Sequence, residues 1–375
     1  MTSDTAEVVR ELTVYESAIE ATDIIDRKQL RPIQHGLFGE VGGIMTAAKK
    51  LVRERTSYPG YLMAAEEEFG DTLWYFAALC RRRGVGLTDV LDVTVAPKAA
   101  AARPRTSGGQ VAGGPSTQPS DDLDGALMLL GRSAAALLDS TPSVEQLKEF
   151  GCRYVEALAE TGISLVDVAK ANYRKASGAF LEPLREDLAD FDKDFGPEEQ
   201  LPREFRIRVN QRATGKSYLQ WNGVFIGDPL SDNITEQDGY RFHDVFHFAN
   251  AAVLHWSPVI RTLIKHKRKS KAGFDEEQDG GRAIVVEEGL TAWIFSRAKQ
   301  LNYFESETRV SLGILKTIHD FVGGYEVESC PMKLWEHTIL QGFSVFRQLK
   351  SAEGGIIVGD RATRTLRYEP LGEQE

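Results

Sequence analysis

One stretch of the chain, residues 96–120, is unable to take part in a hydrophobic core. Its sequence, APKAAAARPRTSGGQVAGGPSTQPS, replaces nearly all large apolar side chains with Ala, Gly, Pro, Ser and Thr. A segment of this composition buries too little apolar surface to offset the entropy cost of ordering it. We therefore expect a flexible linker here, and the folded parts of the protein must come from the sequence on either side.

Both flanks of this linker have the apolar spacing of amphipathic helices. Apolar residues recur three and four positions apart, which predicts helices over residues 5–26, 30–55, 60–83, 122–139, 143–160 and 164–185. Thr141 followed by Pro142 has the pattern of a helix N-cap with proline in the first helical position. Up to about residue 195 we therefore expect an all-α helical bundle.

The two flanks also resemble each other. The word EFG at residues 68–70 precedes an apolar helix and then RGVGLTDV, and the same word at 149–151 precedes a shorter helix and then TGISLVDV. This similarity indicates an internal duplication of a helical hairpin, unless helix-forming sequences share these words by chance. Cys152 stands where the first copy has Asp71. If the duplication is real, we expect only the first copy to bind metal.

After about residue 195 the pattern changes to a mixture of strands and helices. Alternating apolar residues at Phe205, Ile207 and Val209 predict a strand, and Asn222-Gly223 predicts a two-residue hairpin turn. Further helices are expected near residues 239–266, 281–301, 308–322 and 331–350, with a closing hairpin at 356–358 and 365–368. This part should be an α+β, mainly helical domain with short β-hairpins.

The sequence thus predicts two domains, residues 1–195 and 196–375, and its composition excludes several classes of partner. The net charge of −10 argues against general nucleic-acid binding, which needs an excess of Lys and Arg, and the basic run at 265–271 is expected to be a solvated loop. No apolar run approaches the ~20 residues that span a bilayer, and the acidic start lacks a signal-peptide pattern. With three widely spaced cysteines, we expect a cytoplasmic protein without a membrane partner.

Acidic residues at helical spacing in the first half indicate a hard-cation site. Glu68 and Asp71 are three positions apart and project from one helix face. Glu40 on the neighbouring helix completes a set of oxygen ligands that suits Mg²⁺ or Mn²⁺. The alternative is that these acids only make a helix surface soluble. The apolar neighbours Phe69 and Leu73 oppose that alternative, because an unpaired carboxylate beside apolar surface is costly.

The word EFGD followed by LWYFAAL resembles the MazG-like all-α nucleoside triphosphate pyrophosphohydrolases, which are related to the dimeric dUTPases. The later segment ISLVDVAKANYRKASGAF is similar to the closing helix of that family, in which Asn172 and Lys175 would approach the substrate. The resemblance covers roughly residues 15–185. It implies Mg²⁺-dependent hydrolysis of a nucleotide to its monophosphate and pyrophosphate. It also implies Glu40, Glu68 and Asp71 as catalytic metal ligands, and a homo-oligomer of two or more subunits.

One position departs from the family pattern. The family has ExxE on the first helix, and this chain has Gly43 in place of the second Glu. Three carboxylates still suit one Mg²⁺, but a second ion would bind more weakly unless Glu67 or the substrate replaces the missing ligand. The resemblance therefore implies an activity that is reduced, altered or lost. Lys49 would add positive charge near the polyphosphate, and Trp74 would line a base pocket unless it belongs to the core.

Six of the seven histidines follow residue 240, and two of them have the spacing of metal ligands. His243 and His247 lie one helical turn apart in HDVFH, and Glu287 or Glu288 in VVEEGLTAWIF would complete a site for Zn²⁺, Mn²⁺ or Fe. Weaker candidates are His319, Asp320, Glu336 and His337. The histidines would otherwise be satisfied by hydrogen bonds in a polar pocket. A zincin-like protease is a further alternative, which the shorter Asp in place of the usual Glu opposes.

The segment GDPLSDNITEQDGYRFHDVFHFANAAVLHWSPV resembles the C-terminal domain that is fused to some MazG-like proteins. Two functional hypotheses follow. The first is a nucleotide pyrophosphohydrolase whose second domain selects the substrate or processes the product. The second is a nucleotide-sensing effector or phage-defence protein whose C-terminal domain is a metal-dependent hydrolase. Release of pyrophosphate from a panel of nucleotides distinguishes them.

Overall fold

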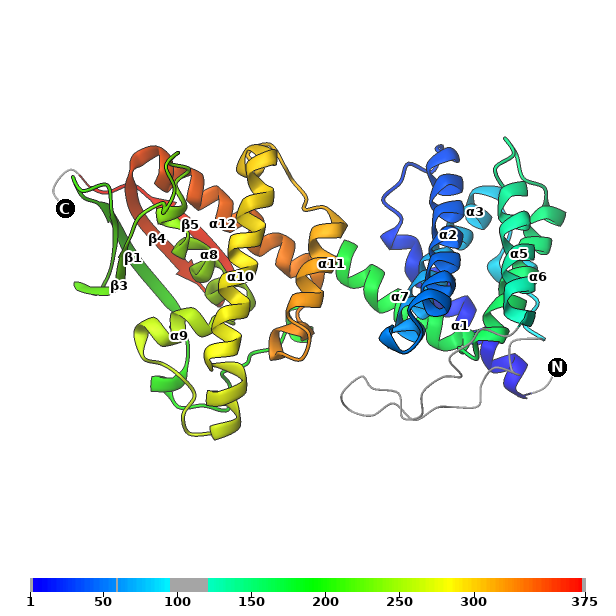
Figure 1. Ribbon diagram of the computed structural model, residues 1–375, viewed down its shortest axis with the longest axis horizontal. Coiled ribbons are helices and arrows are strands. Elements are labelled where there is room, and N and C mark those ends of the chain that lie inside the picture. Colours follow the sequence, from blue (N-terminus) through cyan, green and yellow to red (C-terminus); the bar gives the residue numbers. More distant parts are fainter. Residues whose placement is uncertain (1–2, 59, 95–120, 373–375) are drawn as a thin grey trace. The chain divides into compact units, whose positions relative to one another are not determined.

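The protein is divided into two compact units, Met1–Leu181 and Glu182–Glu375, which are drawn in Figure 1. The computed structural model describes residues 3–58, 60–94 and 121–372, so the expected linker at 96–120 lies outside the described residues. The described part of the first unit is helical, and the second unit combines helices with a five-stranded antiparallel sheet. The fold class expected from the sequence is therefore confirmed.

Two helical hairpins form the framework of the N-terminal unit. Its described helices are α1 (Ser3–Ile19), α2 (Arg31–Glu54), α3 (Tyr61–Arg83), α4 (Leu87–Val90), α5 (Asp121–Ala136), α6 (Val144–Thr161) and α7 (Leu165–Phe180). Helix α2 packs on α3 as one hairpin, α5 packs on α6 as the other, and α7 packs against α1 and α3. The expected helices are present, although the first ends at Ile19 and not at residue 26.

The repeated word EFG has a packing role in both hairpins. The phenylalanine of each copy is fully buried. The glycine that follows it allows a close approach: a Cβ at Gly70 would lie 3.0 Å from Cβ of Asn172, and a Cβ at Gly151 would overlap the carbonyl oxygen of Val90. Both α3 and α6 then end at a left-handed glycine. The two halves thus share the residues that determine how their helices pack and end.

The start of α6 differs from the expectation. Its N-cap is Ser143, not Thr141. The Ser143 side chain accepts a hydrogen bond from the backbone N–H of Gln146, whose own side chain accepts one from the backbone N–H of Ser143. This reciprocal capping box satisfies two N–H groups that a cap at Thr141 would leave to solvent, which explains the later start.

The sheet of the C-terminal unit is built from both ends of its sequence. The described elements are β1 (Glu204–Gln211), β2 (Ser217–Trp221), β3 (Val224–Leu230), α8 (Asp244–Ala249), α9 (Pro258–Ile264), α10 (Gly281–Ala298), α11 (Leu312–Phe321), α12 (Met332–Ala352), β4 (Gly354–Asp360) and β5 (Thr365–Glu369). The strand order is β3-β2-β1-β4-β5. Helices α8 and α12 pack against β4 and β5, and this side of the sheet carries the core (Figure 1).

The expected strands and the first hairpin are confirmed. Phe205, Ile207 and Val209 of β1 are buried on one face. Trp221 pairs with Val224, so the two residues between them form the turn. Those residues, Asn222 and Gly223, have φ values of 48° and 81°, as a two-residue type I′ turn requires.

The helix expected over residues 239–266 is interrupted in the structure. Helix α8 ends at Ala249 and continues as a π-helical segment, Asn250–Leu254. His255 then takes the left-handed conformation, with a φ of 61°. Helix α9 begins afresh, with Ser257 as its N-cap and Pro258 in its first turn. The apolar periodicity was continuous, but proline and the capping serine end one helix and start another.

The division between the units falls before residue 182, earlier than the boundary expected after residue 195. Asp192 explains the difference, because this buried carboxylate forms ion pairs with Arg261 and Arg361 of the C-terminal unit. A buried ion pair holds its segment firmly, since separating the partners leaves a buried charge without compensation. The segment after residue 182 therefore belongs to the C-terminal unit.

The basic run at residues 265–271 is not simply a solvated loop. Arg268 is fully buried. Its guanidinium donates to Asp279 at 2.7 Å and to Glu326 at 2.6 Å. Lys271 lies over the ring of Phe195, 4.6 Å from its centroid. The run thus stabilises the C-terminal unit internally, and its buried arginine is not available to bind a polyanion.

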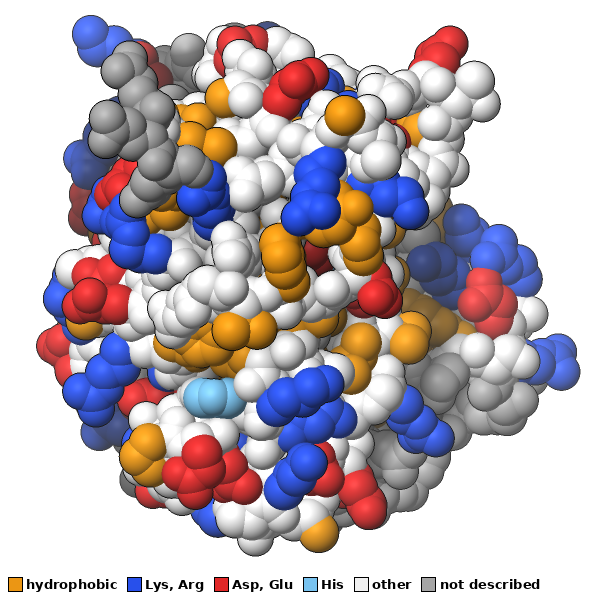
Figure 2. All heavy atoms as spheres, turned by 90° about the vertical axis from the view of Figure 1, so that its left-hand side faces the viewer, with side chains coloured by type: hydrophobic (Ala, Val, Ile, Leu, Met, Phe, Trp, Pro, Cys, Tyr) orange, Lys and Arg blue, Asp and Glu red, His pale blue; other side chains and the backbone are white. Residues whose placement is uncertain are grey.

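One face of the C-terminal unit is shown in Figure 2, where charged side chains of both signs surround smaller groups of hydrophobic ones. Among the exposed hydrophobic residues of this unit are Val224 and Phe225 on the edge strand β3. Asp228 and Pro229 interrupt that edge, which hinders pairing with another strand. No helix in the described part of the chain is long and apolar enough to cross a membrane.

Replacing Gly151 by alanine should destabilise the N-terminal unit, because the added Cβ overlaps the backbone of Val90 and the helix must shift. We expect a loss of about 1–3 kcal/mol in the free energy of unfolding. Gly125→Ala is the matched control, since this glycine lies within α5 with open space around its Cβ position. That change should stabilise the helix by about 0.5–1 kcal/mol. Denaturation followed by circular dichroism measures both, and equal effects of the two changes would contradict the packing role of Gly151.

Candidate functional site

The carboxylates expected to bind metal lie on the first helical hairpin. Glu40 lies on α2, and Glu68 and Asp71 lie on α3. All three are half-buried. Phe69 and Leu73, both fully buried, hold the inner face of α3 against the core. Within the described residues the ligand atoms of these three acids are not all gathered within 4.8 Å of one another.

Asp71 links α3 to α7 in the N-terminal unit. It accepts hydrogen bonds from Lys175 Nζ at 2.5 Å and from Asn172 Nδ2 at 3.1 Å. Lys175 also contacts Glu67 at 2.7 Å. Both donors lie on α7, about a hundred residues further along the chain, so the fold brings together the residues that the family resemblance had implied. These contacts place a cation and an amide donor beside the acidic face of α3.

Tyr15 orients this group and was not expected from the sequence. Its hydroxyl donates to Asn172 Oδ1 at 2.8 Å, which leaves the amide nitrogen of Asn172 directed at Asp71. Burial raises the pKa of Tyr15 well above its usual value, with a smaller contribution from nearby acidic groups. The phenol therefore remains a donor. Apolar helical spacing by itself does not distinguish such a residue from an ordinary core residue.

The glycine that replaces the second Glu of the family motif lies under Glu68. A Cβ at Gly43 would overlap Oε2 of Glu68. The Glu68 carboxylate therefore rests on the backbone of α2 at the place where the missing side chain would begin. A longer residue at position 43 would require the Glu68 carboxylate to move. The end of the Glu68 side chain is flexible enough to do so. A neighbouring candidate ligand thus occupies the space that a side chain at position 43 would need.

Two further residues proposed from the sequence lie apart from this arrangement. Trp74 is only 8% exposed and belongs to the core of the unit. Its indole N–H donates to Thr22 Oγ1 at 2.8 Å. Of the two roles expected for Trp74, a base pocket and the core, the structure favours the core, because its ring is covered and its polar atom is satisfied. Lys49 is exposed on α2.

In the C-terminal unit, two histidines are held by their Nδ1 atoms. His243 precedes α8, and its Nδ1 lies 2.9 Å from the carbonyl oxygen of Tyr240. Its ring stacks on the Tyr240 ring with 4.3 Å between centroids. His247, one turn later, has its Nδ1 at 3.0 Å from Glu287 Oε1. Because both partners are acceptors, Nδ1 is the donor in each imidazole.

Glu287 is fully buried and acts as a hydrogen-bond acceptor for three segments. Besides His247, it accepts from Asn250 at 2.9 Å, from the hydroxyl of Ser257 at 2.8 Å and from the backbone N–H of Val259 at 2.9 Å. Its oxygens are thus engaged within the protein. Of the two acids expected as alternative metal ligands, Glu287 is therefore already engaged in these contacts and acts as a positioning residue for His247.

Glu288, the next residue, lies on the other side of the same histidines. Its Oε2 is 3.4 Å from Nε2 of His247 and 3.8 Å from Nε2 of His243. Within the described residues, these three side chains form a group whose ligand atoms all lie within 4.8 Å of one another. The carboxylate is 43% exposed, so the group is open on one side.

The charges around His247 strongly affect its protonation. Burial by itself lowers the pKa of His247, but the charge and hydrogen bond of Glu287, together with Glu288, raise it to about 10. The same interaction with His247 lowers the pKa of Glu288. Burial raises the pKa of the neighbouring Asp244. The two glutamates therefore create a site that favours positive charge.

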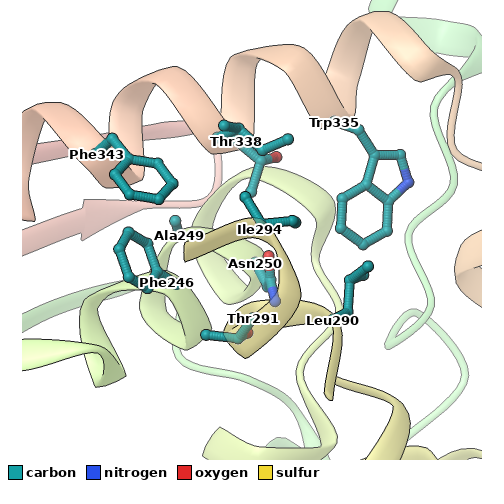
Figure 3. A pocket seen from close by; sticks show the side chains of 10 residues that line it. Phe246, Ala249, Asn250, Leu290, Thr291, Ile294, Trp335, Thr338 and Phe343 are labelled. Carbon is teal, nitrogen blue, oxygen red and sulfur yellow. The ribbon is translucent and has the colours of Figure 1, made fainter. Parts of the chain in front are cut away.

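A small cavity adjoins these residues without offering room for a substrate. It has a volume of about 20 Å³, which is enough for roughly one water molecule. Figure 3 shows it between the rings of Phe246 and Phe343 and the indole of Trp335, with Asn250 and Thr291 contributing polar atoms. Thr338 adds a hydroxyl, and the other lining residues are apolar or aromatic. We interpret it as a packing cavity of the core.

The weaker candidates from the sequence lie outside the histidine group. His319 and Asp320 are at the end of α11, and Glu336 and His337 are in α12. Glu336 is buried, and its carboxylate accepts the backbone N–H of Val310 at 2.9 Å. Within the described residues none of these four side chains joins His243, His247 and Glu288.

The two adjacent glutamates of α10 should differ sharply in their effect on stability. Glu287→Ala leaves buried donors without an acceptor, so the free energy of unfolding should fall by about 3–5 kcal/mol. Glu288→Ala removes a half-exposed carboxylate and should cost less than about 1 kcal/mol. Four of the five tryptophans lie in this unit, so denaturation followed by tryptophan fluorescence reports on it. Similar losses in the two variants would show that Glu287 does not organise these segments.

The chain was also compared with known proteins. The comparisons with curated proteins and with solved structures found no match. Residues 186–372 match a family model described as the MazG C-terminal domain. This range corresponds closely to the compact unit that begins at residue 182 and includes the sheet, α8 and α10. The C-terminal unit is therefore similar to the MazG C-terminal domain over residues 186–372.

Proposed function

We propose that the N-terminal unit hydrolyses nucleoside triphosphates to the monophosphate and pyrophosphate in the presence of Mg²⁺ or Mn²⁺. The observation that carries this proposal is the convergence of Asn172 and Lys175 on Asp71. These residues match the positions that the pyrophosphohydrolase resemblance assigns to substrate contact and metal binding. A MazG-related C-terminal domain in the same chain supports a nucleotide-related role.

The three acids, Lys175 and Asn172 have different tasks in the proposed reaction. Glu40, Glu68 and Asp71 would hold the cation, which supplies an activated water and neutralises charge on the phosphoryl oxygens. Lys175, now paired with acidic side chains, would exchange them for the polyphosphate. Asn172, oriented by a buried phenol, would donate a hydrogen bond to the substrate. The reaction therefore needs donors from α7 and acids from α3 in one place.

The duplicated hairpins support a bundle completed within one chain. Related dimeric enzymes are expected to assemble such hairpins from two subunits, whereas here α2–α3 and α5–α6 lie in one unit. We also propose that the protein forms a homo-oligomer and that its C-terminal domain selects the substrate or processes the product. Light scattering coupled to size-exclusion chromatography measures the number of subunits in the proposed homo-oligomer.

Glu68→Gln should lower Mg²⁺-dependent pyrophosphate release from a panel of NTPs and dNTPs by at least about 100-fold, because it removes charge from the cation site without changing shape. Glu149→Gln is the matched control, since Glu149 is the corresponding residue of the second hairpin and pairs with Arg153. It should retain full activity. A Glu68→Gln protein that turns over normally would place the reaction elsewhere.

A second function is favoured by one observation. Gly43 removes a carboxylate that the family motif contains, and Glu68 leans into the space above it. A site altered in this way would bind a nucleotide with little turnover. The protein would then be a nucleotide sensor or defence effector whose C-terminal domain acts on another target.

Gly43→Glu tests this second function. Under the hydrolase proposal, the restored carboxylate should lower the Mg²⁺ concentration needed for half-maximal pyrophosphate release, because it adds an oxygen ligand. Gly39→Glu, one turn earlier on α2 with open space around its Cβ position, is the control and should leave that concentration unchanged. Wild-type protein that binds nucleotide without releasing pyrophosphate, with release appearing only in Gly43→Glu, would favour the sensor.

A further inference from the structure

We propose that His243, His247 and Glu288 hold one divalent transition-metal ion in the C-terminal unit, with Glu287 positioning His247. The site would be distinct in chemistry from the carboxylate group of the N-terminal unit. It would use two imidazole nitrogens and one carboxylate oxygen.

The orientation of the two imidazoles is the first argument. Each histidine donates through Nδ1 to a fixed acceptor, which is the Tyr240 carbonyl for His243 and the Glu287 carboxylate for His247. Metal-binding histidines in proteins usually have such an outer partner on the nitrogen that does not bind the ion. Both Nε2 atoms are therefore left to face Glu288. Two histidines arranged in this way on successive turns indicate a built site.

The second argument is a buried nitrogen without a hydrogen-bond partner among the described residues. His247 is fully buried, and within the described residues its Nε2 makes no hydrogen bond. Buried polar atoms in proteins almost always have a hydrogen-bond partner or a ligand. This nitrogen is directed at the carboxylate of Glu288, which lies 3.4 Å away, beyond a good hydrogen bond but suitable for two ligands of one ion.

The spacing of the three atoms fits coordination. Ligands around a tetrahedral ion with bonds of about 2.0–2.1 Å lie roughly 3.3 Å apart. Glu288 Oε2 is 3.4 Å from His247 Nε2 and 3.8 Å from His243 Nε2, and all three ligand atoms lie within 4.8 Å of one another. Only small side-chain movements are needed to close the group around an ion.

The chemistry of the ligands selects the class of metal. Imidazole nitrogen with one carboxylate suits Zn²⁺, Mn²⁺ or Fe²⁺, whereas Mg²⁺ prefers oxygen ligands. Three protein ligands leave a position for solvent, as in catalytic and not in closed structural zinc sites. The exposed side of Glu288 provides that opening. The site is therefore suited to activate a water molecule.

The experiment uses the full chain and Co²⁺ as a spectroscopic probe. Excess Mg²⁺ is present throughout to occupy the N-terminal carboxylates. The wild-type protein should bind one equivalent of Co²⁺ with visible d–d absorption of low-symmetry coordination, and Zn²⁺ should displace it. Glu288→Gln and His243→Ala should each weaken binding by at least about 100-fold, more than the usual effect of an outer partner. His319→Ala, which changes a histidine on α11, should bind like the wild type.

Two further results decide the proposal. Glu287→Gln should weaken Co²⁺ binding by about 10–100-fold while keeping the same absorption bands, because it changes the partner of His247 and not a ligand. Circular dichroism of every variant checks that it is folded, and Glu288→Gln is expected to fold because its side chain is half-exposed. Undiminished Co²⁺ binding by Glu288→Gln and His243→Ala, or no binding by the wild type, would overturn the proposal. Neither result depends on pyrophosphate release by the N-terminal unit.

Discussion

A single buried carboxylate organises the C-terminal domain. Glu287 is covered completely, and four donors from α8, the π-helical segment and α9 converge on its two oxygens. A charged group in this environment is stable only when its hydrogen bonds are made, so it requires the break before Ser257 and the N-terminus of α9 to lie where they do. The same contact holds His247 in one orientation and thereby determines which nitrogen faces Glu288. Stability and the candidate metal site thus depend on one residue.

The N-terminal unit uses an acid in a comparable but more open way. Asp71 joins α3 to α7 through Lys175 and Asn172, and Tyr15 fixes the amide from the far side. These groups come from helices that are distant in sequence and are brought together by the packing of α7 against α1 and α3. Because 18% of the Asp71 side chain remains exposed, its partners are able to exchange for a ligand. Asp71, whose partners can be exchanged, is suited to binding a substrate. Glu287, whose hydrogen bonds are enclosed, is suited to holding the structure together.

Much of the secondary structure followed from local physical chemistry. Asn222-Gly223 formed the expected hairpin turn because few residues accept positive φ at two adjacent positions. The prediction of one helix over residues 239–266 was wrong, because the apolar spacing continues through a break in the helix. Apolar periodicity indicates which residues are buried, but it does not indicate which acceptors the backbone N–H groups bind. The prediction that Arg268 lies in a solvated loop was wrong for a related reason. Its hydrogen-bond partners, Asp279 and Glu326, come from separate parts of the sequence.

The sequence by itself determined the helical and mixed halves, the acidic face of α3 and the spacing of His243 and His247, since these depend on neighbours one or two turns away. Only the tertiary structure decided which of the adjacent glutamates on α10 is enclosed and which is open. Successive residues on a helix point about 100° apart, so Glu287 faces the core and its neighbour Glu288 lies on the exposed side of the histidine pair. Which direction is the core depends on the packing of α8 and α9 against α10, and no local pattern specifies it.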